Sequence, residues 1–244
     1  MPRVPVTIQA VVFDLDDTLY LERDYVRSGY RAAAEYLQHQ RPARPGEPRD
    51  AAQTYEAWLW QRFLAGQSAG AFDAMNASFR LALTGPQILE LVDVYRRHRP
   101  DVRPCDGIPE MLGRLHADFR LALLTDGYLP GQRLKLEALK IERFFDAVVF
   151  TEELGRSAWK PSPAGFEVIH RKLGVAQESL AYVADNPGKD FVAPNLLSWR
   201  TVQFLQPGQI HARRPAPPGG EPQIIVRSPG ELRDALLGHE RVHA

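Results

Sequence analysis

The stretch VVFDLDDTL, residues 11–19, joins an apolar run directly to a cluster of carboxylates. The apolar residues 8–13 predict a buried strand that ends at Asp14. Asp14 and Asp16 are two positions apart, so their side chains project from one side of an extended chain, about 6.5 Å apart. Carboxylates this close repel each other unless a cation or a proton lies between them. An aspartate-rich turn would explain this stretch alone, so the rest of the chain must decide whether it is a site.

Composition excludes several classes of protein. The 244 residues are enough for one large domain or two modest ones. Thirty basic residues balance 30 acidic ones, so the overall charge gives no support to nucleic-acid or membrane-surface binding. Cys105 is the only cysteine, which excludes an internal disulfide and a cysteine-rich zinc site. Because no apolar run approaches about 18 residues and the amino terminus lacks a signal-peptide pattern, the sequence predicts a soluble cytoplasmic protein.

Residues 21–100 show helical periodicity and no strand pattern, which predicts an inserted helical domain. Prolines interrupt residues 41–48, so this segment is expected to be a loop. The aromatic density predicts the core of a small bundle, with the alternative that Trp58 or Trp60 lines a substrate cavity. Four helices are expected, marked in turn by Tyr25 with Leu37, Asp50 with Leu59, Phe72 with Phe79, and Ile88 with Tyr95.

From Pro104 onward, strand-like apolar runs alternate with helical patterns, which predicts a parallel sheet covered on both faces. The predicted fold is therefore α/β, with residues 1–20 and 101–244 forming a Rossmann-like core domain. Asp106 is expected to cap the first helix of this region. Residues 206–222 are rich in proline and glycine and are expected to form a surface loop with no function. Further strands are expected at 119–124, 145–150, 180–184, 201–204 and 223–226.

Polar groups lie at the ends of the predicted strands, where ligands bind in an open α/β sheet. Each has an ordinary explanation alone, as a turn residue or a solvated charge, but together they form a coherent site. Several carboxylates around one lysine and one hydroxyl suit Mg²⁺ and a phosphoryl group. The seven histidines include no pair at metal-binding spacing, which argues against zinc. The converging groups are Asp14 with Asp16, Thr125, Lys160, and Asp185 with Asp190.

In these residues the chain resembles the haloacid dehalogenase superfamily, whose four motifs occur here in the usual order. The segment Asp14-Leu15-Asp16-Asp17-Thr18 resembles the first motif, Thr125 the second, Lys160 the third and Asp185 through Asp190 the fourth. The resemblance spans Val11 to about Val202, and the insertion between the first two motifs is where members of subfamily I carry a helical cap. The chain departs from the family at Ala184, where many members have glycine.

The resemblance implies a Mg²⁺-dependent phosphatase that acts on a small phosphorylated metabolite through an aspartyl-phosphate. It implies Asp14 as the nucleophile and Asp16 as the general acid and base. It further implies Thr125, Asp126 and Lys160 as phosphate-binding residues. Asp14, Asp16 and Asp185 would hold the metal, and Asp190 would support Lys160 or the metal shell.

Three other functions are weighed against this one. A dehalogenase of the family lacks an aspartate at the position of Asp16, and a phosphomutase would keep the same acids and differ in the cap. A binding protein that kept this fold without its catalysis would be expected to have lost at least one of four residues. All four are present: Asp14, Asp16, Lys160 and Asp185. The expected partner is a small phosphorylated substrate, with no nucleic acid and no membrane, and no oligomeric state is predicted. Candidates for binding a second anionic group of the substrate are Arg23, Arg27, Arg31 and Arg62.

Overall fold

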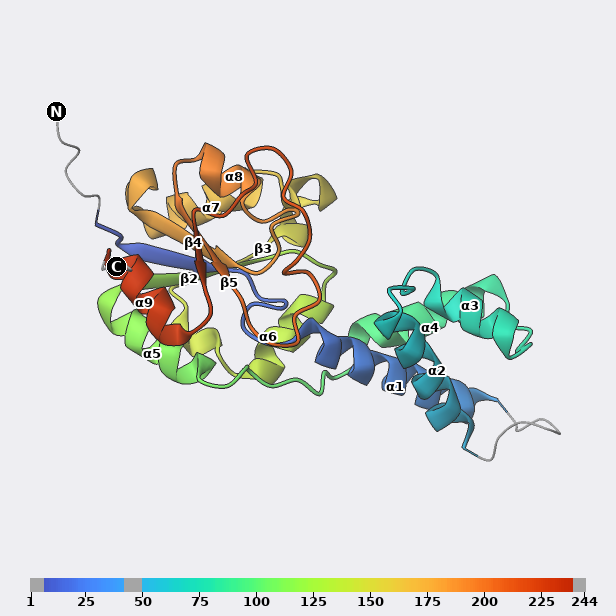
Figure 1. Ribbon diagram of the computed structural model, residues 1–244. Coiled ribbons are helices and arrows are strands. Elements are labelled where there is room, and N and C mark those ends of the chain that lie inside the picture. Colours follow the sequence, from blue (N-terminus) through green and yellow to red (C-terminus); the bar gives the residue numbers. More distant parts are fainter. Residues whose placement is uncertain (1–6, 42–49, 239–244) are drawn as a thin grey trace. The chain divides into compact units, whose positions relative to one another are not determined.

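In the computed structural model, the structure describes residues 7–41 and 50–238, which fall into two compact units (Figure 1). The first unit is drawn from residues 1–23, 103–128 and 139–244. The second is drawn from residues 24–102 and 129–138, so it contains most of the predicted helical insertion and an additional segment that follows the second motif. The predicted loop at 41–48 lies outside the described residues except for Arg41.

The first unit is built on a parallel sheet of six described strands in the order β3-β2-β1-β4-β5-β6. β1 lies between β2 and β4, and Phe13 is opposite both Leu123 and Val183. Four of the described strands, β1, β3, β4 and β6, consist of apolar residues because helices cover both faces of the sheet. The predicted α/β fold is confirmed, although β1 begins at Ala10 and not at Ile8. The strands are β1 (Ala10–Phe13), β2 (Arg120–Thr125), β3 (Ala147–Phe150), β4 (Leu180–Ala184), β5 (Arg200–Phe204) and β6 (Ile224–Val226).

Helices α7 (Ala164–Leu173) and α8 (Val192–Leu196) lie on one face of the sheet, and α5 (Ile108–Asp118) and α9 (Pro229–Leu237) lie on the other (Figure 1). The apolar stripe of α7 packs on alternate strand residues, and burying such a side chain contributes about 1.5–3 kcal/mol. Gly174 ends α7 in the left-handed conformation, as expected from the sequence. The residues buried together on this face include Phe166, Ile169, Leu173, Val12, Leu124 and Trp199.

The start of α5 differs from the sequence-based prediction. Asp106 was expected as the cap, but the N-cap residue is Gly107, with φ 77°. Glycine populates this left-handed conformation without the steric cost that a side chain brings. The helix therefore begins at a left-handed glycine and not at a side-chain cap. Asp106 lies one residue before this glycine.

The second unit contains the four predicted helices, except for the first two residues of the first one, Glu22 and Arg23. It also contains α6 (Gly131–Leu139), except for its last residue. Its core is formed by apolar residues from all four helices, among them Tyr30, Leu59, Met75 and Leu91. Trp58 packs against this core, as the bundle reading of the aromatic residues predicts. The four helices are α1 (Glu22–Gln40), α2 (Ala51–Leu64), α3 (Ala71–Ser78) and α4 (Gly85–Arg97).

A buried polar cluster ties α1 to the end of α4. The imidazole Nδ1 of His98 lies 2.7 Å from the carbonyl oxygen of Tyr95, and its Nε2 lies 2.8 Å from Ser28 Oγ. The ammonium of Lys135, on α6, lies 4.0 Å from the centroid of the Tyr25 ring on α1, a cation–π contact. These contacts explain why the start of α6 belongs to the same compact unit as α1 and α4.

Residues 206–222 form no strand or helix in the structure, as predicted, but the segment is more than a surface loop. The side chain of Gln206 donates to the carbonyl oxygen of Thr18, and that of Gln209 donates to the carbonyl oxygen of Asp17. The predicted loop is therefore present, and the absence of a function stays a prediction. The segment supports the turn that carries the first motif.

Candidate active site

The strand order brings the predicted site residues to one edge of the sheet. Asp14 directly follows β1, Asp185 directly follows β4, and Thr125 is the last residue of β2. Because these three strands are neighbours and parallel, their carboxyl ends meet at the same edge. Lys160 reaches this edge from the segment before α7 and contacts Asp14.

Lys160 lies at the centre of a buried group of charges. Its ammonium Nζ lies 2.6 Å from Asp14 Oδ1, 2.9 Å from Asp190 Oδ1 and 3.0 Å from the hydroxyl of Tyr182. Its side chain is only 1% exposed, and those of Asp14 and Asp190 are 4% and 0% exposed. A buried ammonium needs compensating negative charge, so the two aspartates keep Lys160 protonated in the interior.

The pKa shifts follow from burial and from these contacts. Burial raises the pKa of Asp14 to about 7, although the ammonium of Lys160 acts in the opposite direction. Burial by itself lowers the pKa of Lys160, but the carboxylates of Asp14 and Asp190 outweigh it and raise that pKa well above its ordinary value. The site therefore holds a permanent positive charge beside a carboxyl that titrates near neutral pH.

Three carboxylates form a group with the dimensions of a metal site. One oxygen from each of Asp14, Asp185 and Asp190 lies within 4.8 Å of the others. Among the described residues, Asp185 Oδ2 is buried without a hydrogen-bond partner. Burial and then the charge of Asp190 raise the pKa of Asp185 to about 10, which reflects uncompensated negative charge. Buried carboxylate oxygens of this kind are the ligands that Mg²⁺ takes, so the residues present fit the metal predicted from the sequence.

Asp16 lies apart from that carboxylate group. It is half-buried, and one oxygen of its carboxylate accepts a hydrogen bond from the hydroxyl of Tyr20, which is fully buried. Of the three predicted metal ligands, the structure thus brings Asp14 and Asp185 together with Asp190. It leaves Asp16 oriented by Tyr20, on the turn that follows β1.

The second and third motifs are joined through Asp126. Its carboxylate accepts hydrogen bonds from the backbone N–H of Lys160 at 3.2 and 3.3 Å and from the hydroxyl of Thr151 at 2.8 Å. Lys189 Nζ lies 3.5 Å from the same carboxylate. Thr125 is fully buried at the end of β2, and its hydroxyl lies 3.4 Å from the carbonyl oxygen of Asp126. The phosphate-binding role of Asp126 stays a prediction.

Four residues around the site were not identified from the sequence: Tyr20, Thr151, Tyr182 and Lys189. Thr151 directly follows β3, so the rule that points to the carboxyl ends of strands would have found it. Tyr182 stands in a run of aliphatic residues, where a buried hydroxyl requires a partner, but the identity of that partner depends on the fold. The signal for Lys189 is its charge beside Asp190.

The predicted arginines and tryptophans of the second unit have partners within it. Arg27 and Arg31 lie 3.5 and 3.6 Å from the carboxylate of Glu56, and the guanidinium of Arg62 lies 5.1 Å from the centroid of the Trp58 ring. Trp60 stacks on Phe63, with ring centroids 5.2 Å apart. Protein contacts therefore account for these side chains, and a role in substrate binding stays a prediction.

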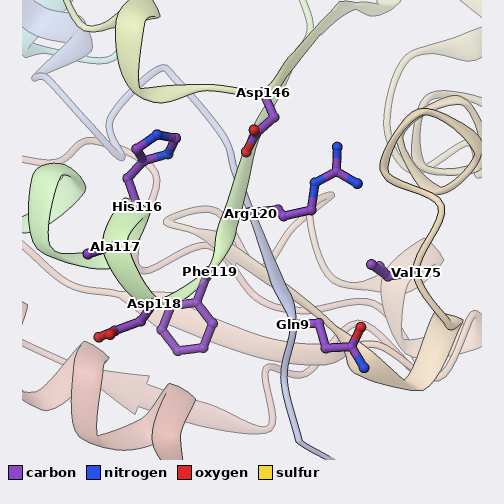
Figure 2. Close-up of a pocket in the computed structure, with 8 residues that line it drawn as sticks. All are labelled: Gln9, His116, Ala117, Asp118, Phe119, Arg120, Asp146 and Val175. Atoms are coloured by element: carbon purple, nitrogen blue, oxygen red, sulfur yellow. The ribbon is translucent and has the colours of Figure 1, made fainter.

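A hollow of about 380 Å³ lies at the opposite edge of the sheet (Figure 2). It is lined by residues that precede strands, such as Gln9 before β1, Phe119 before β2 and Asp146 before β3. The carboxylate of Asp146 accepts a hydrogen bond from the N–H of Leu121 at 2.8 Å, so it is bound to the backbone of β2. The hollow is thus separate from the carboxylates that follow β1 and β4.

Among residues 7–41 and 50–238, no helix combines the length and the apolar character that a membrane span requires. The longest, α1, has 19 residues and carries charges along its length.

The chain is similar to known proteins over most of its length. Residues 8–193 match the family model of the haloacid dehalogenase-like hydrolases. The glyceraldehyde 3-phosphate phosphatase of Methanopyrus kandleri is 28% identical over 240 residues, which cover 94% of this chain and 97% of the relative. The phosphoserine phosphatase of Thermus thermophilus is 31% identical over 259 residues, which cover 94% and 98%. The structure of the hydrolase YfnB from Bacillus subtilis bound to magnesium superimposes with a TM-score of 0.64 at 20% identity, covering 94% and 99%.

Proposed function

The chain belongs to the haloacid dehalogenase-like hydrolases, and we propose that it is a Mg²⁺-dependent phosphatase of a small phosphorylated metabolite. The observation that carries the proposal is the buried contact of Lys160 with Asp14 beside the partnerless oxygen of Asp185. A lysine that is already paired with a carboxylate attracts no further anion by itself. A cation bound at Asp14 and Asp185 would restore positive charge to the site, and a phosphoryl group then fits.

Two phosphatases among the relatives support this function. One is named for glyceraldehyde 3-phosphate and the other for phosphoserine, and both align over nearly the full length of this chain. Both named substrates are phosphate monoesters of small molecules. We therefore propose a phosphate monoester as the substrate class.

In the proposed mechanism, a carboxylate oxygen of Asp14 attacks phosphorus and the ester P–O bond breaks. The leaving oxygen takes a proton from Asp16, whose carboxyl is oriented by Tyr20. Water then attacks the phosphorus of the aspartyl-phosphate, Asp16 accepts its proton, and the release of phosphate restores Asp14. Bound Mg²⁺ supplies positive charge that reduces the repulsion between two anions.

Lys160, Thr125 and Asp190 have supporting roles in this proposal. The ammonium of Lys160 contacts the nucleophile, so it also lies beside the oxygens of a phosphoryl group that Asp14 attacks. The hydroxyl of Thr125, at the end of β2, is expected to donate to the same group. Asp190 holds Lys160 at 2.9 Å and accepts a hydrogen bond from the N–H of Asn186 at 3.2 Å, which fixes the loop after β4.

The rival functions are less well supported by the residues. A dehalogenase would not need Asp16, which stands here with a tyrosine to orient it. A phosphomutase would need a cap that returns the phosphoryl group to the substrate, and a retired binding protein would have no use for a buried and uncompensated Asp185. We further propose that residues 21–100 act as the cap, and a cytoplasmic location stays a prediction from the sequence.

The proposal is tested with a panel of phosphorylated metabolites, assayed by phosphate release with Mg²⁺ and after chelation. We expect activity on at least one phosphate monoester that is lost on chelation. The matched control is Asp14→Asn, which keeps the shape of the side chain and removes the attacking anion, so it should fold with the circular dichroism of the wild type and lose activity. Substantial turnover by Asp14→Asn would remove Asp14 from the role of nucleophile. Full activity after exhaustive chelation would contradict the metal.

A further inference from the structure

One segment, residues 203–212, is hydrogen-bonded to two loops that adjoin the proposed metal ligands Asp14 and Asp185. The first loop is the turn at residues 16–18, which follows β1. The second begins at Asp185, which follows β4. The segment runs from the end of β5 into the proline- and glycine-rich stretch. Its contacts with the two loops are made mainly by three glutamines.

On the side of the first loop, the segment donates hydrogen bonds to two carbonyl groups of the turn. Gln206 Nε2 lies 2.7 Å from the carbonyl oxygen of Thr18, and Gln209 Nε2 lies 2.6 Å from that of Asp17. Gln209 is itself held, because its Oε1 accepts from the N–H of Gln206 at 2.8 Å and its Nε2 also donates to Phe204 at 2.8 Å. Contacts within the segment thus fix the orientation of the Gln209 side-chain amide that donates to the turn.

The turn needs such support because Asp17 adopts an unfavourable backbone conformation. Its φ of 54° is in the left-handed region, which costs a residue with a side chain about 1–2 kcal/mol. The carboxylate of Asp17 is fully buried and accepts from the N–H of Ile210 at 2.7 Å and from that of Glu22 at 2.8 Å. Three hydrogen bonds to Asp17, two of them from the segment, therefore hold a strained residue directly beside Asp16.

On the side of the second loop, Gln203 makes the connection. Its side chain is buried, and its Nε2 donates to the carbonyl oxygen of Asp185 and to that of Ala212, both at 2.8 Å. Gln203 thus fixes the backbone of Asp185, whose carboxylate oxygen Oδ2 has no hydrogen-bond partner. The spacing of the two loops is set through one piece of chain.

We propose that Gln203 and Gln209 are positioning residues that hold the turn directly after Asp14 and the loop of Asp185 in the geometry that Mg²⁺ requires at these two aspartates. Mg²⁺ demands a nearly ideal octahedron with oxygens at about 2.1 Å, so it tolerates little displacement of a loop. Residues that orient metal ligands without touching the metal typically change affinity by about 10- to 100-fold when replaced. The inference rests on the metal of the proposed function, and it goes beyond it by assigning a role to residues 203–212.

The test is a calorimetric titration of Mg²⁺ into metal-free protein without substrate. Gln209→Met keeps the length of the side chain and removes its donors, and we expect the dissociation constant to rise about tenfold or more. The matched control is Gln223→Met, which also removes two donor contacts, to Trp199 and Asn195, from the same unit. The control should keep the wild-type dissociation constant within about twofold. An unchanged constant in Gln209→Met, or an equal rise in both variants, would overturn the inference.

Two further measurements separate positioning from other effects. Hydrogen exchange of the metal-free protein should become faster at residues 15–22 in Gln209→Met and not in Gln223→Met, and at saturating Mg²⁺ the kcat should recover to within about twofold of the wild type. Gln206→Met, which frees the carbonyl of Thr18, serves as the second variant should Gln209→Met fail to fold. A wild type that binds no Mg²⁺ contradicts the metal and the inference together. A wild type that binds Mg²⁺ and hydrolyses phosphate, with a Gln209→Met that exchanges and binds like it, contradicts the inference alone.

Discussion

Asp16 and Asp14 differ in their surroundings although they are two residues apart. Asp14 is buried against an ammonium that stays charged, whereas Asp16 is half-buried and oriented by a neutral tyrosine hydroxyl. A carboxylate between a lysine and a metal is suited to attack phosphorus, and a carboxyl outside that group is suited to exchange protons with the leaving oxygen and with water. The difference in environment is consistent with the different roles proposed for the two residues.

Asp16→Ala should separate the two chemical steps. An aryl phosphate has a leaving group of low basicity and needs little protonation, so the first step with p-nitrophenyl phosphate should slow far less than with an alkyl phosphate. The second step still requires a base for water, so the variant should show a burst of nitrophenol and then slow turnover. General acid and base help contributes about 10²- to 10⁴-fold, which is the expected steady-state loss.

Rapid-quench trapping of the aspartyl-phosphate tests this expectation, with calorimetry to verify that the variant still binds Mg²⁺. Tyr20→Phe is the matched control, because it removes the donor to Asp16 and leaves the carboxyl in place. Its loss should be smaller than that of Asp16→Ala in both steps. Steady-state turnover of Asp16→Ala at the wild-type rate would remove the acid and base role.

Mg²⁺ binding should strengthen as the pH rises. The raised pKa values of Asp14, about 7, and Asp185, about 10, mean that the metal-free protein still holds protons on these groups at neutral pH. Mg²⁺ needs both ionised, so binding releases protons and the dissociation constant should fall about tenfold per pH unit for each proton released. The stability of the metal-free protein should depend on pH in the opposite direction. Its native state binds more protons than the unfolded state, so the free energy of unfolding should decline as the pH rises from about 4 through about 7 and on toward about 10.

Calorimetric titrations at about pH 6 and about pH 8, in buffers of different ionisation enthalpy, measure both the affinity and the number of protons released. Asp185→Asn is the control, because it removes one of the two proposed ligands and should weaken Mg²⁺ binding at both pH values. An affinity that is independent of pH over this range would contradict a metal bound at Asp14 and Asp185.

At the scale of the elements, the packing of α1 on the end of α4 leaves no room at Gly29. A Cβ at this position would lie 2.6 Å from two ring carbons of Tyr95 and 3.1 Å from the ring of His98. Overpacking of this kind costs about 1–3 kcal/mol, which exceeds the roughly 1 kcal/mol that alanine gains over glycine in a helix. We therefore expect Gly29→Ala to destabilise the second unit.

Gly85→Ala is the matched control for that change. Gly85 is the first residue of α4, and no described atom lies within 4 Å of the position of its Cβ. Alanine there should be neutral or stabilise the protein by up to about 1 kcal/mol. Urea unfolding followed by circular dichroism compares the two, and a Gly29→Ala protein as stable as Gly85→Ala would show that Tyr95 moves aside without cost.

The elements that the sequence predicted best are those with a local signal at both ends. β4 has the predicted bounds because five apolar residues are followed by a run of turn residues that begins at Asp185. α9 begins where predicted because Ser228 caps it, accepting from the N–H of Glu231. The cap of α5 was missed because it depends on a left-handed glycine and not on a side-chain acceptor.

The candidate site was predictable to the extent that its residues follow strands. Asp14, Thr125 and Asp185 were found from that rule, and the family resemblance is confirmed by the match over residues 8–193. The support of the site was not predictable, because the contacts of Gln203, Gln209 and Tyr182 join segments far apart in the sequence. Turn-rich composition at 206–222 says that a loop is present and says nothing about what the loop holds.

At the scale of the whole molecule, the predicted reacting groups and the predicted specificity groups lie in different units. Asp14, Asp16, Lys160 and Asp185 all belong to the first unit, and the tryptophans of α2 belong to the second. The chain passes between the units near residues 23, 102, 128 and 138, so the second unit is connected to the first by more than the two ends of an insertion. The crossing near residue 128 comes two residues after Asp126, which holds the backbone of Lys160.

Because of this division, we expect substitutions in the second unit to change the selectivity among substrates. They should not change the rate at which the aspartyl-phosphate is hydrolysed, since the alcohol has already left at that step. Trp60 is half-buried and stacked on Phe63, with Arg27 5.4 Å from its ring centroid, whereas Trp58 packs against the core of the unit. Trp60→Ala should therefore alter the ratios of kcat/KM among phosphate monoesters several-fold. The hydrolysis of the aspartyl-phosphate, which begins after the alcohol has left, should keep its rate.

The measurement pairs kcat/KM for a panel of monoesters with the single-turnover decay of trapped aspartyl-phosphate. Trp58→Ala is the control, because it removes a side chain of the same size that packs against the core of the unit. Truncating a fully buried tryptophan costs about 3–5 kcal/mol of stability, so the loss for this half-buried ring should be smaller. A change in ratios seen only with Trp60→Ala assigns selectivity to the surface of α2. Equal changes in both variants would instead reflect loosening of the bundle, and unchanged ratios in Trp60→Ala would place substrate selection outside this part of the second unit.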